Sequence, residues 1–552
     1  MNKLPIHYFL SLVIAVFGVV YSQQSAAESS TPNPSVTLAE LSEPLVGANL
    51  RKMPALVERL ELEAGTTALP VLEALLAGEL YYQRSDKRLV RAVSQTEGGF
   101  QISDVFSTDA LGSVAKKQIR KVKLNNALRV QLRAAIGRLT LLSDDPKLRL
   151  TAIENMLKKP DQANLELLQQ ARAQETDSDI VDLLNEALAL NLLIAATDRQ
   201  PRLQALRELE GSLQPAVRNA LQALVALDAD AQPLEQDIVV FTSASRLLDK
   251  IDGKLGFYAF LETLFFGLSL GSVLLLIATG LAITFGVMGV INMAHGELIM
   301  LGAYTTYVVQ LLMPNHIEYS LLVAVPAAFL VSGLVGILIE RSVIRFLHGR
   351  PLETLLATFG VSLILQQAVR SIFSPLNRQV ATPEWMSGSL EINSIFSLTY
   401  NRLYVFLFAL LVFVLLQLIL KRTTLGLNVR AVSQNRSMAK AMGVKTDWVD
   451  AMTFGLGSGV AGLAGVALSQ LTNVGPNLGQ AYIIDSFMVV VFGGVGNLWG
   501  TLVAGLSLGV FTKFLEPATG AVMAKILVLV FIVLFIQKRP RGLFPQQGRA
   551  AE

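Results

Sequence analysis

The sequence predicts an all-α polytopic membrane protein with a mainly α-helical, water-soluble domain in front of it. Of its 552 residues, 52% are hydrophobic and only 16% are charged. The mean hydropathy of +0.49 is too high for an ordinary soluble protein. Charge is also uneven: residues 256–552 hold 18 Lys and Arg and 12 Asp and Glu, whereas the shorter stretch 28–255 holds 27 and 31. We therefore expect water to solvate the front half and lipid the back half.

Residues 1–27 have the pattern of a secretory signal peptide. Lys3 supplies the positive charge, residues 8–20 supply the apolar region, and residues 25–27 (Ser-Ala-Ala) supply a small-residue cleavage site. The alternative is an uncleaved first membrane helix, although the apolar run is shorter than the ~20 residues that a span needs. On either interpretation, the segment that begins at residue 28 is able to face the periplasm.

The front domain, residues 28–255, is expected to be helical with a small β insertion. Apolar residues recur at helical spacing over residues 36–80, and short β-like runs lie between residues 79 and 112. The helical period returns over residues 119–227. Three stretches within it resemble one another, which is typical of a HEAT-like array or, equally, of a plain helical bundle. These stretches are residues 145–157, 177–193 and 201–227.

The back half, residues 256–552, contains eight long apolar runs. Some are longer than one ~20-residue span, so about eight or nine crossings fit. The runs are residues 257–287, 297–313, 320–338, 354–373, 403–420, 448–471, 483–515 and 522–536.

Lys and Arg in the short loops predict the orientation of these spans. The segments rich in Lys and Arg, which we expect to be cytoplasmic, are residues 341–350, 421–445 and 538–549. The loops with one basic residue or none, which we expect outside, are those near residue 315 and over 375–401 and 473–480. This alternation requires residues 483–515 to cross twice. It then places residues 28–255 outside, as the signal peptide independently requires.

Two glycine-rich segments interrupt apolar runs in corresponding parts of the membrane half. Residues 285–302 read F-G-V-M-G-V-I-N-M-A-H-G-E-L-I-M-L-G, and residues 492–505 read F-G-G-V-G-N-L-W-G-T-L-V-A-G. Broken helices persist in a membrane where the freed backbone groups meet protein or a wet cavity, so such a pair indicates a transport pathway. Close helix packing through small residues is the alternative.

Polar residues within or beside the apolar runs are candidates to line such a pathway. They are Asn292, His295, Glu297, Gln366 and Asn497. Amide side chains offer both donors and acceptors, and no run of facing charges crosses the membrane, so the set suits a neutral polar solute. His295 and Glu297 also fit a structural pair at the end of a helical hairpin.

A third motif lies in the basic segment 421–445. Ser433 is a plausible N-cap and Gly443 a plausible C-cap of a short helix. Val432, Ala439 and Met442 would form an apolar stripe beside Arg436 and Lys440. Such a helix needs a partner, either the ATPase of an ATP-driven importer or the lipid surface. The sequence has no G-x-x-x-x-G-K-[ST] phosphate loop, so ATP would be hydrolysed by another subunit.

Several classes of function are excluded. Without cysteine there is no disulfide, thiol catalysis or thiolate metal site. No catalytic constellation, metal site or cofactor motif is present, so we do not expect an enzyme. The net charge of +3 gives no footprint for nucleic acid.

Three stretches carry a resemblance to a known family: residues 292–307, 423–443 and 475–501. They resemble the LivH-type permeases of branched-chain amino-acid ABC importers, and the long front domain resembles the urea-transporter (UrtB-type) branch. The resemblance implies an inner-membrane permease that works with a second permease subunit, two cytoplasmic ATPase subunits and a periplasmic solute-binding protein. It implies urea or a short-chain amide as solute. A branched-chain amino-acid permease, a passive or ion-coupled urea pathway, and a receptor role for the front domain are the alternatives.

Overall fold

The computed structural model describes residues 38–94, 99–107, 109–115, 117–160, 164–228, 230, 232–393 and 395–544. The predicted signal peptide, residues 1–27, lies outside these described residues. The chain separates into two compact units, one made of Met1–Ser212 with Asn219–Ala244 and the other of Leu213–Arg218 with Ser245–Glu552. The expected domain boundary after residue 255 falls inside the continuous helix α11 (Ile238–Met288).

Short helices open the first unit and build its first hydrophobic core. They are α2 (Leu38–Ser42), α3 (Met53–Ala64) and α4 (Leu69–Ala77), with the 3-10 turns η2 (Glu43–Leu45) and η3 (Gly65–Ala68). Val57, Leu72 and Leu132 are completely buried in this core. The apolar residues at helical spacing over residues 36–80 thus supply the buried faces of these helices.

An antiparallel sheet follows, as the β-like runs between residues 79 and 112 predict. Its strands are β1 (Leu80–Gln83), β2 (Leu89–Ser94), β3 (Gly99–Asp104), β4 (Ala110–Ala115) and β5 (Ile119–Lys121), in the order β4-β3-β2-β1-β5. Tyr81 of β1 pairs with Val90 of β2 on one side and with Lys121 of β5 on the other. The expectation of helix from residue 119 is wrong at its start, because residues 119–121 form an edge strand of the sheet.

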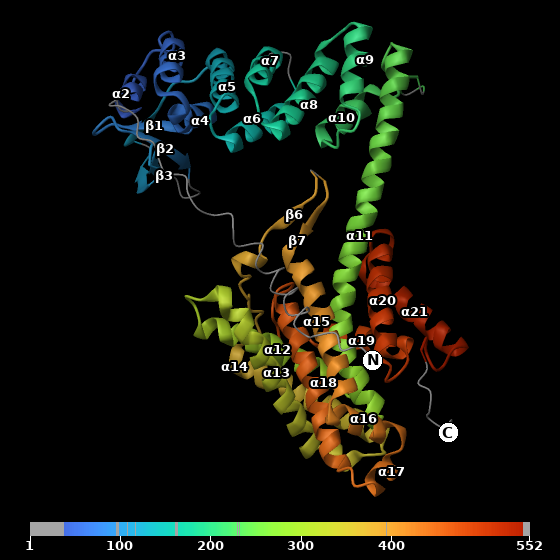
Figure 1. Cartoon of the computed structure of the whole chain (residues 1–552). Helices are drawn as coiled ribbons and strands as arrows, with labels where there is room; N and C mark the ends of the chain where they lie inside the picture. Colours follow the sequence, from blue (N-terminus) through green and yellow to red (C-terminus); the bar gives the residue numbers. More distant parts are fainter. Residues whose placement is uncertain are drawn as a thin grey trace. The chain divides into compact units, whose positions relative to one another are not determined.

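The helices after the sheet are α5 (Asn126–Leu141), α6 (Pro146–Lys158), α7 (Leu165–Gln174), α8 (Ser178–Ala195), α9 (Arg199–Glu208) and α10 (Pro215–Leu224). Asp145 and Asp177 cap α6 and α8, each accepting a hydrogen bond from a backbone amide two residues on, at 2.9 and 3.0 Å. The predicted stretch 201–227 is divided between α9 and α10. Figure 1 shows α5 to α9 in a row in sequence order, which both a HEAT-like array and a plain helical bundle permit.

The second unit is a bundle of membrane helices. It contains most of α11, then α12 (His295–Leu312), α13 (Ile317–Ser342), α14 (Pro351–Phe373), α15 (Tyr400–Arg422), α16 (Thr424–Gln434), α17 (Arg436–Ala441), α18 (Thr446–Ser469), α19 (Gln480–Gly493), α20 (Leu498–Thr519) and α21 (Ala521–Lys538). The turns η5 (Ile344–Leu347) and η6 (Glu384–Met386) and the hairpin β6 (Ser389–Glu391) and β7 (Ser397–Thr399) lie in its loops.

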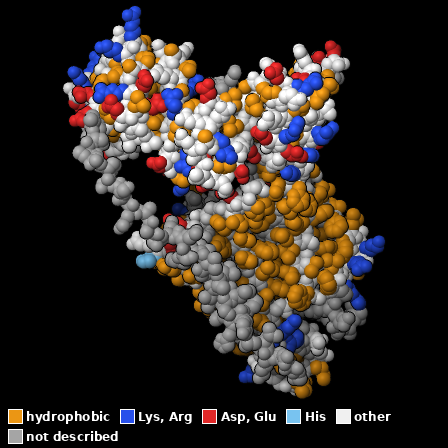
Figure 2. All heavy atoms as spheres, turned by 45° about the horizontal axis from the view of Figure 1, so that its top comes forward, with side chains coloured by type: hydrophobic (Ala, Val, Ile, Leu, Met, Phe, Trp, Pro, Cys, Tyr) orange, Lys and Arg blue, Asp and Glu red, His pale blue; other side chains and the backbone are white. Residues whose placement is uncertain are grey.

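Within the described residues, seven helices are long and apolar enough to span a membrane: α11, α13, α14, α15, α18, α20 and α21. The less apolar α12 and the shorter α19 join them in the bundle. Residues 483–515 do divide into two helices, α19 and α20, as the expected alternation of the loops requires. The chain is therefore a multi-pass membrane protein, and Figure 2 shows hydrophobic side chains gathered over the membrane unit.

Contacts between loops sort the helix ends into two sets. At one end, Arg345 Nη2 lies 3.2 Å from Asp447 Oδ2, which joins the basic loops after α13 and before α18. At the other end, the amide of Arg378 donates to the carbonyl of Val474 at 2.7 Å. The loops rich in Lys and Arg thus gather at one end of the bundle, separate from loops nearly free of them.

Helix α18 is the buried centre of the bundle and packs against α12 and α13. The approach is close: a Cβ atom added to Gly302 of α12 would lie 2.1 Å from the carbonyl oxygen of Gly462 on α18. Small residues allow such contact between membrane helices. Close packing therefore explains Gly302, one of the glycines that the sequence also associates with a pathway.

Candidate transport pathway and coupling segment

Glycine-containing breaks interrupt the membrane helices at both predicted places. The first lies between Met288 of α11 and His295 of α12, and the second between Gly493 of α19 and Leu498 of α20. Gly289, Gly494 and Gly496 have positive φ angles of 68°, 103° and 79°, a conformation that favours glycine. The prediction that glycines break both helices is confirmed.

The two breaks lie against each other. A Cβ atom added to Gly286, in the last turns of α11, would lie 2.6 Å from Cα of Gly496. In each break, an asparagine side chain also accepts a hydrogen bond from a backbone amide at the start of the next helix. Asn292 Oδ1 accepts from the amide of Ala294 at 3.0 Å, and Asn497 Oδ1 accepts from the amide of Trp499 at 3.0 Å. Segments about 200 residues apart in sequence therefore form one structural element.

Glu297 and Gln366 come together in a buried polar cluster between α12 and α14. Glu297 Oε1 accepts hydrogen bonds from Gln366 Nε2 at 2.7 Å and from Ser362 Oγ at 2.9 Å. Nearer the first break, Thr358 Oγ1 accepts from the amide of Met293 at 3.1 Å. We call this row the α12–α14 polar seam.

The α14 side of the seam has a regular pattern that the sequence interpretation missed, apart from Gln366. The residues Thr354, Thr358, Ser362 and Gln366 recur every four positions and are all buried. Residues four apart share one face of a helix, whereas Leu352, Leu356 and Ile364 of the same helix are exposed. A helix with polar residues facing inward and apolar residues outward is typical of a membrane bundle. The four-residue spacing was the available signal.

Several buried polar atoms around the first break have no hydrogen-bond partner within the described part of the chain. They are Asn292 Nδ2, His295 Nδ1 and Glu297 Oε2. The His295 ring turns away from the seam, because its Nε2 lies 3.1 Å from the carbonyl oxygen of Ile277 on α11. Buried polar atoms are nearly always paired, so this region has unmet capacity to bind water or a polar solute.

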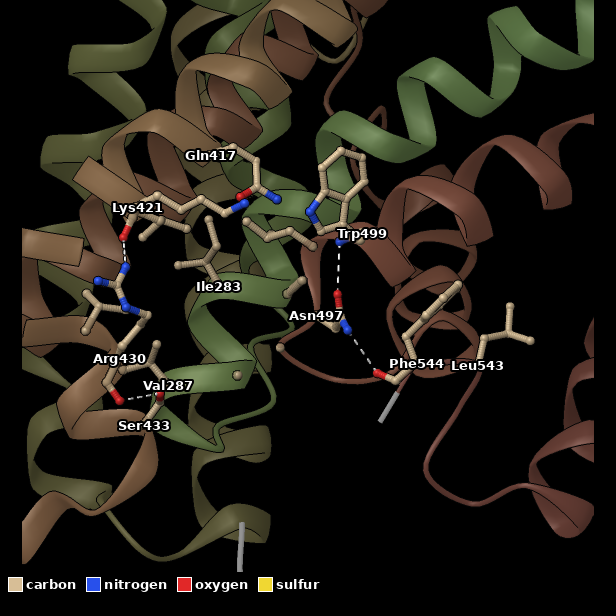
Figure 3. Close-up of a pocket in the computed structure, with 16 residues that line it drawn as sticks. Ile283, Val287, Gln417, Lys421, Arg430, Ser433, Asn497, Trp499, Leu543 and Phe544 are labelled. Carbon is tan, nitrogen blue, oxygen red and sulfur yellow. Dashed lines mark hydrogen bonds between the residues drawn. The ribbon is translucent and has the colours of Figure 1, made fainter. Parts of the chain in front are cut away.

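Asn497 belongs to a different site. It lines a cavity of about 650 Å³, and none of the other four described candidates lines it. Its Nδ2 donates to the carbonyl of Phe544 at 3.2 Å, as Figure 3 shows. Its hydrogen bonds join the start of α20 to the C-terminal segment.

The predicted short helix of the basic segment begins later than expected. The structure has two helices, α16 and α17, with the break at Asn435, whose Oδ1 accepts from the amide of Met438 at 2.9 Å. Ser433 lies in the last turn of α16 and donates to the carbonyl of Arg430 at 2.9 Å, so its assignment as an N-cap is wrong. Gly443 follows α17 with a φ of +86°, as a helix-ending glycine should.

The apolar stripe of this segment is divided between two faces. Val432 and Ala439 are buried within the chain, against Val429 and Val449. Met442 is 80% exposed. The expectation that Ala439 faces a partner is therefore wrong, because Ala439 packs on its own chain.

Arg436 is used inside the chain, whereas Lys440 is exposed. Arg436 forms a bidentate ion pair with the buried carboxylate of Asp450 on α18. Burial lowers the pKa of His348, in the loop before α14, and the positive charge of Arg436 lowers it further. These contacts fasten α17 to the bundle and leave Met438, Lys440 and Met442 on its outer surface.

The similarity to known proteins lies in the membrane half of the chain. The family described as "Branched-chain amino acid transport system / permease component" matches residues 263–536. The high-affinity branched-chain amino acid transport system permease protein BraD of Pseudomonas aeruginosa is 30% identical over 297 residues, which is 52% of this chain and 96% of BraD. The corresponding LivH of Salmonella typhimurium is 31% identical over 298 residues, with the same coverage.

A more distant relative is the ribose import permease protein RbsC of Bacillus subtilis, 29% identical over 140 residues, which is 23% of this chain and 44% of RbsC. No solved structure matches. A relative covered over nearly its whole length at this identity shows the family. The chain belongs to the branched-chain amino acid transport system permease family, as a permease component of an ABC-type transport system.

Proposed function

We propose that this permease forms the inner-membrane pathway of an ATP-driven importer for urea or a short-chain amide. The α12–α14 polar seam is the observation that carries the proposal. Its side chains are hydroxyls, an amide and one carboxyl, and the cation next along this face of α14 is Arg370, which donates to Asn477 Oδ1 at 2.8 Å. Such groups can replace the hydration of a neutral amide, whereas the carboxylate of an amino acid would need a cation or a set of donors.

The second candidate function is a branched-chain amino-acid permease, which the names of BraD and LivH favour. Uptake of labelled urea and leucine, each at low external concentration, distinguishes the two in a strain lacking this gene. We expect loss of urea uptake, with leucine uptake retained. Loss of leucine uptake alone would refute urea as the solute. Urea uptake that persists after ATP depletion would indicate a passive channel.

The proposed partners are a second permease subunit, two cytoplasmic ATPase subunits and a periplasmic solute-binding protein. Helix α17 and the residue after it support the ATPase contact, because they present two exposed methionines and a lysine at the basic end of the bundle. Purification from native membranes, followed by identification of the copurified chains, tests this. A permease that purifies without any ATPase in mild detergent would contradict it.

We further propose that residues 28–255 form a HEAT-like periplasmic domain and that the C-terminus is cytoplasmic. The gathering of basic loops at one end of the bundle supports this orientation. The chain has no cysteine, so single cysteines report cleanly. An impermeant reagent should label Gln101→Cys but not Ser437→Cys in intact cells stripped of their outer membrane, and the reverse pattern would overturn the orientation.

A further inference from the structure

The cavity that Asn497 lines lies among helix ends at the basic end of the membrane unit. Its floor is apolar and comes from Ile283 and Val287 of α11 and Leu420 of α15. Its polar lining includes Gln417, Lys421, Arg430, Ser433 and Asn497. Figure 3 shows Lys421 and Arg430 on one side and Asn497 and Trp499 on the other. The volume of about 650 Å³ is within the range of small-molecule sites.

Two cations line this cavity, Lys421 and Arg430. Neither Lys421 nor Arg430 forms an ion pair with any carboxylate in the part of the chain that the structure describes. Arg430 donates one hydrogen bond through Nη1, to the carbonyl of Leu420. The remaining guanidinium donors of Arg430 and the ammonium of Lys421 are available to an anion. The arrangement therefore favours a negatively charged ligand.

The helices that flank the cavity carry exposed apolar side chains. On α15, Leu415 and Leu418 are exposed, and on α20, Trp499 and Val503 are exposed. The Trp499 ring packs edge-on against Phe413 of α15, with ring centroids 5.6 Å apart. Tryptophan gathers at the level of the lipid headgroups. A ligand in this cavity would therefore meet acyl chains at one side and cations at the other.

We propose that this cavity binds the phosphate-bearing headgroup of an anionic phospholipid from the adjoining leaflet. The phosphate lies between Lys421 and Arg430, Gln417 donates to a glycerol or phosphate oxygen, and the acyl chains run along the apolar faces of α15 and α20. Basic pockets between membrane helices bind acidic headgroups in this way. The proposal does not depend on which solute the permease moves.

The test measures lipid binding to the intact transporter by native mass spectrometry after delipidation. Phosphatidylglycerol and phosphatidylethanolamine are titrated separately, and inorganic phosphate is added in excess as a third arm. We expect phosphatidylglycerol to bind more tightly than phosphatidylethanolamine and phosphate to compete weakly. Equal binding of the two lipids would overturn the proposal, and so would displacement of phosphatidylglycerol by phosphate at equal concentration, which would indicate a free-anion site.

Matched variants locate the site. Lys421→Gln should weaken phosphatidylglycerol binding about fivefold, the effect expected of one cation near a lipid phosphate. Arg422→Gln removes the same charge from the next position, which does not line the cavity, and should leave that affinity unchanged. Arg430→Gln added to Lys421→Gln should abolish the preference for the anionic lipid. The site is wrong if Arg422→Gln weakens binding as much as Lys421→Gln does.

Discussion

Replacing Met442 by serine tests whether α17 contacts the ATPase. Met442 is 80% exposed and Met438 is 59% exposed, at the outer surface of a segment fastened to α18. A substitution at so exposed a side chain changes folding stability by less than about 0.5 kcal/mol. If a groove of the ATPase buries Met442 fully, the lost burial is worth about 1.5–3 kcal/mol. Since about 1.4 kcal/mol is tenfold, ATPase affinity should fall roughly 10- to 100-fold.

The assay titrates purified ATPase into the reconstituted permease and measures complex formation and ATP-driven uptake, with the Tm of the permease as a check on folding. Leu427→Ser is the matched control, because Leu427 is an exposed apolar residue on α16 rather than on α17. We expect Leu427→Ser to leave the affinity unchanged. If Met438→Ser combined with Met442→Ser also binds the ATPase with unchanged affinity, α17 is not the docking element.

Ala439→Asp should behave differently from Met442→Ser, which separates folding from docking. Ala439 is buried beside three valines of its own chain, so an aspartate there is an unpaired carboxylate in an apolar site. We expect a lower Tm of the permease alone, before any ATPase is added. A change confined to ATPase binding, with normal Tm, would show that Ala439 faces the partner after all.

Three further sets of variants test packing and charge. Glu297→Leu leaves two buried donors of α14 without their acceptor, at about 1–3 kcal/mol each, whereas Glu297→Gln retains an acceptor, so the Tm of the leucine variant should be clearly lower. Gly302→Ala places a Cβ atom 2.1 Å from backbone and should reduce folded yield, whereas Gly360→Ala meets no atom within 4 Å and should not. A hydrogen bond from Arg202 lowers the pKa of Glu235. The contact between Arg202 and ionised Glu235 therefore stabilises the folded state at any pH above the pKa that Glu235 has in the unfolded chain. This stabilisation is lost as the pH falls through the folded-state pKa of Glu235. Glu235→Gln should thus lower the Tm at pH 7 but not in acid.

The contrast between a charged front part and an apolar back part was predictable from composition, but the boundary after residue 255 was not, because α11 runs through it without a break. The helix breaks were predictable because glycine is favoured at positive φ, as at Gly494 and Gly496. The exact start of α17 was not. Ser433 and Asn435 are equally good caps by residue type, and in the structure residue 433 lies inside α16, whose Val432 shares a buried cluster with Val449 of α18.

The ion pair of Arg436 was hidden for a related reason. Fourteen residues separate it from Asp450, with the end of one helix and the start of another between them, so no spacing rule joins the pair. The α14 stripe was different, since its spacing was visible in the sequence. It was missed because hydroxyl residues in an apolar run are weak signals alone and become informative only when their common face is buried.

The candidate pathway residues differ in how many of their polar side-chain atoms have hydrogen-bond partners. Asn497 is satisfied: its oxygen accepts from two backbone amides and its nitrogen donates to Phe544, as a structural cap requires. Glu297 is not, because its Oε2 has no partner among the described residues although the side chain is completely buried.

Membrane helices associate through close packing without any carboxyl group, and a buried carboxyl is costly in a bilayer. A purely structural contact between α12 and α14 would therefore be better made with apolar residues. The contact instead uses a carboxyl, hydroxyls and an amide. This choice is explained if, during transport, these groups break their hydrogen bonds with one another and form hydrogen bonds with water or solute. On this argument Glu297→Gln, which keeps a hydrogen-bond acceptor, should change transport more than stability, whereas substitution of Asn497 should mainly change stability.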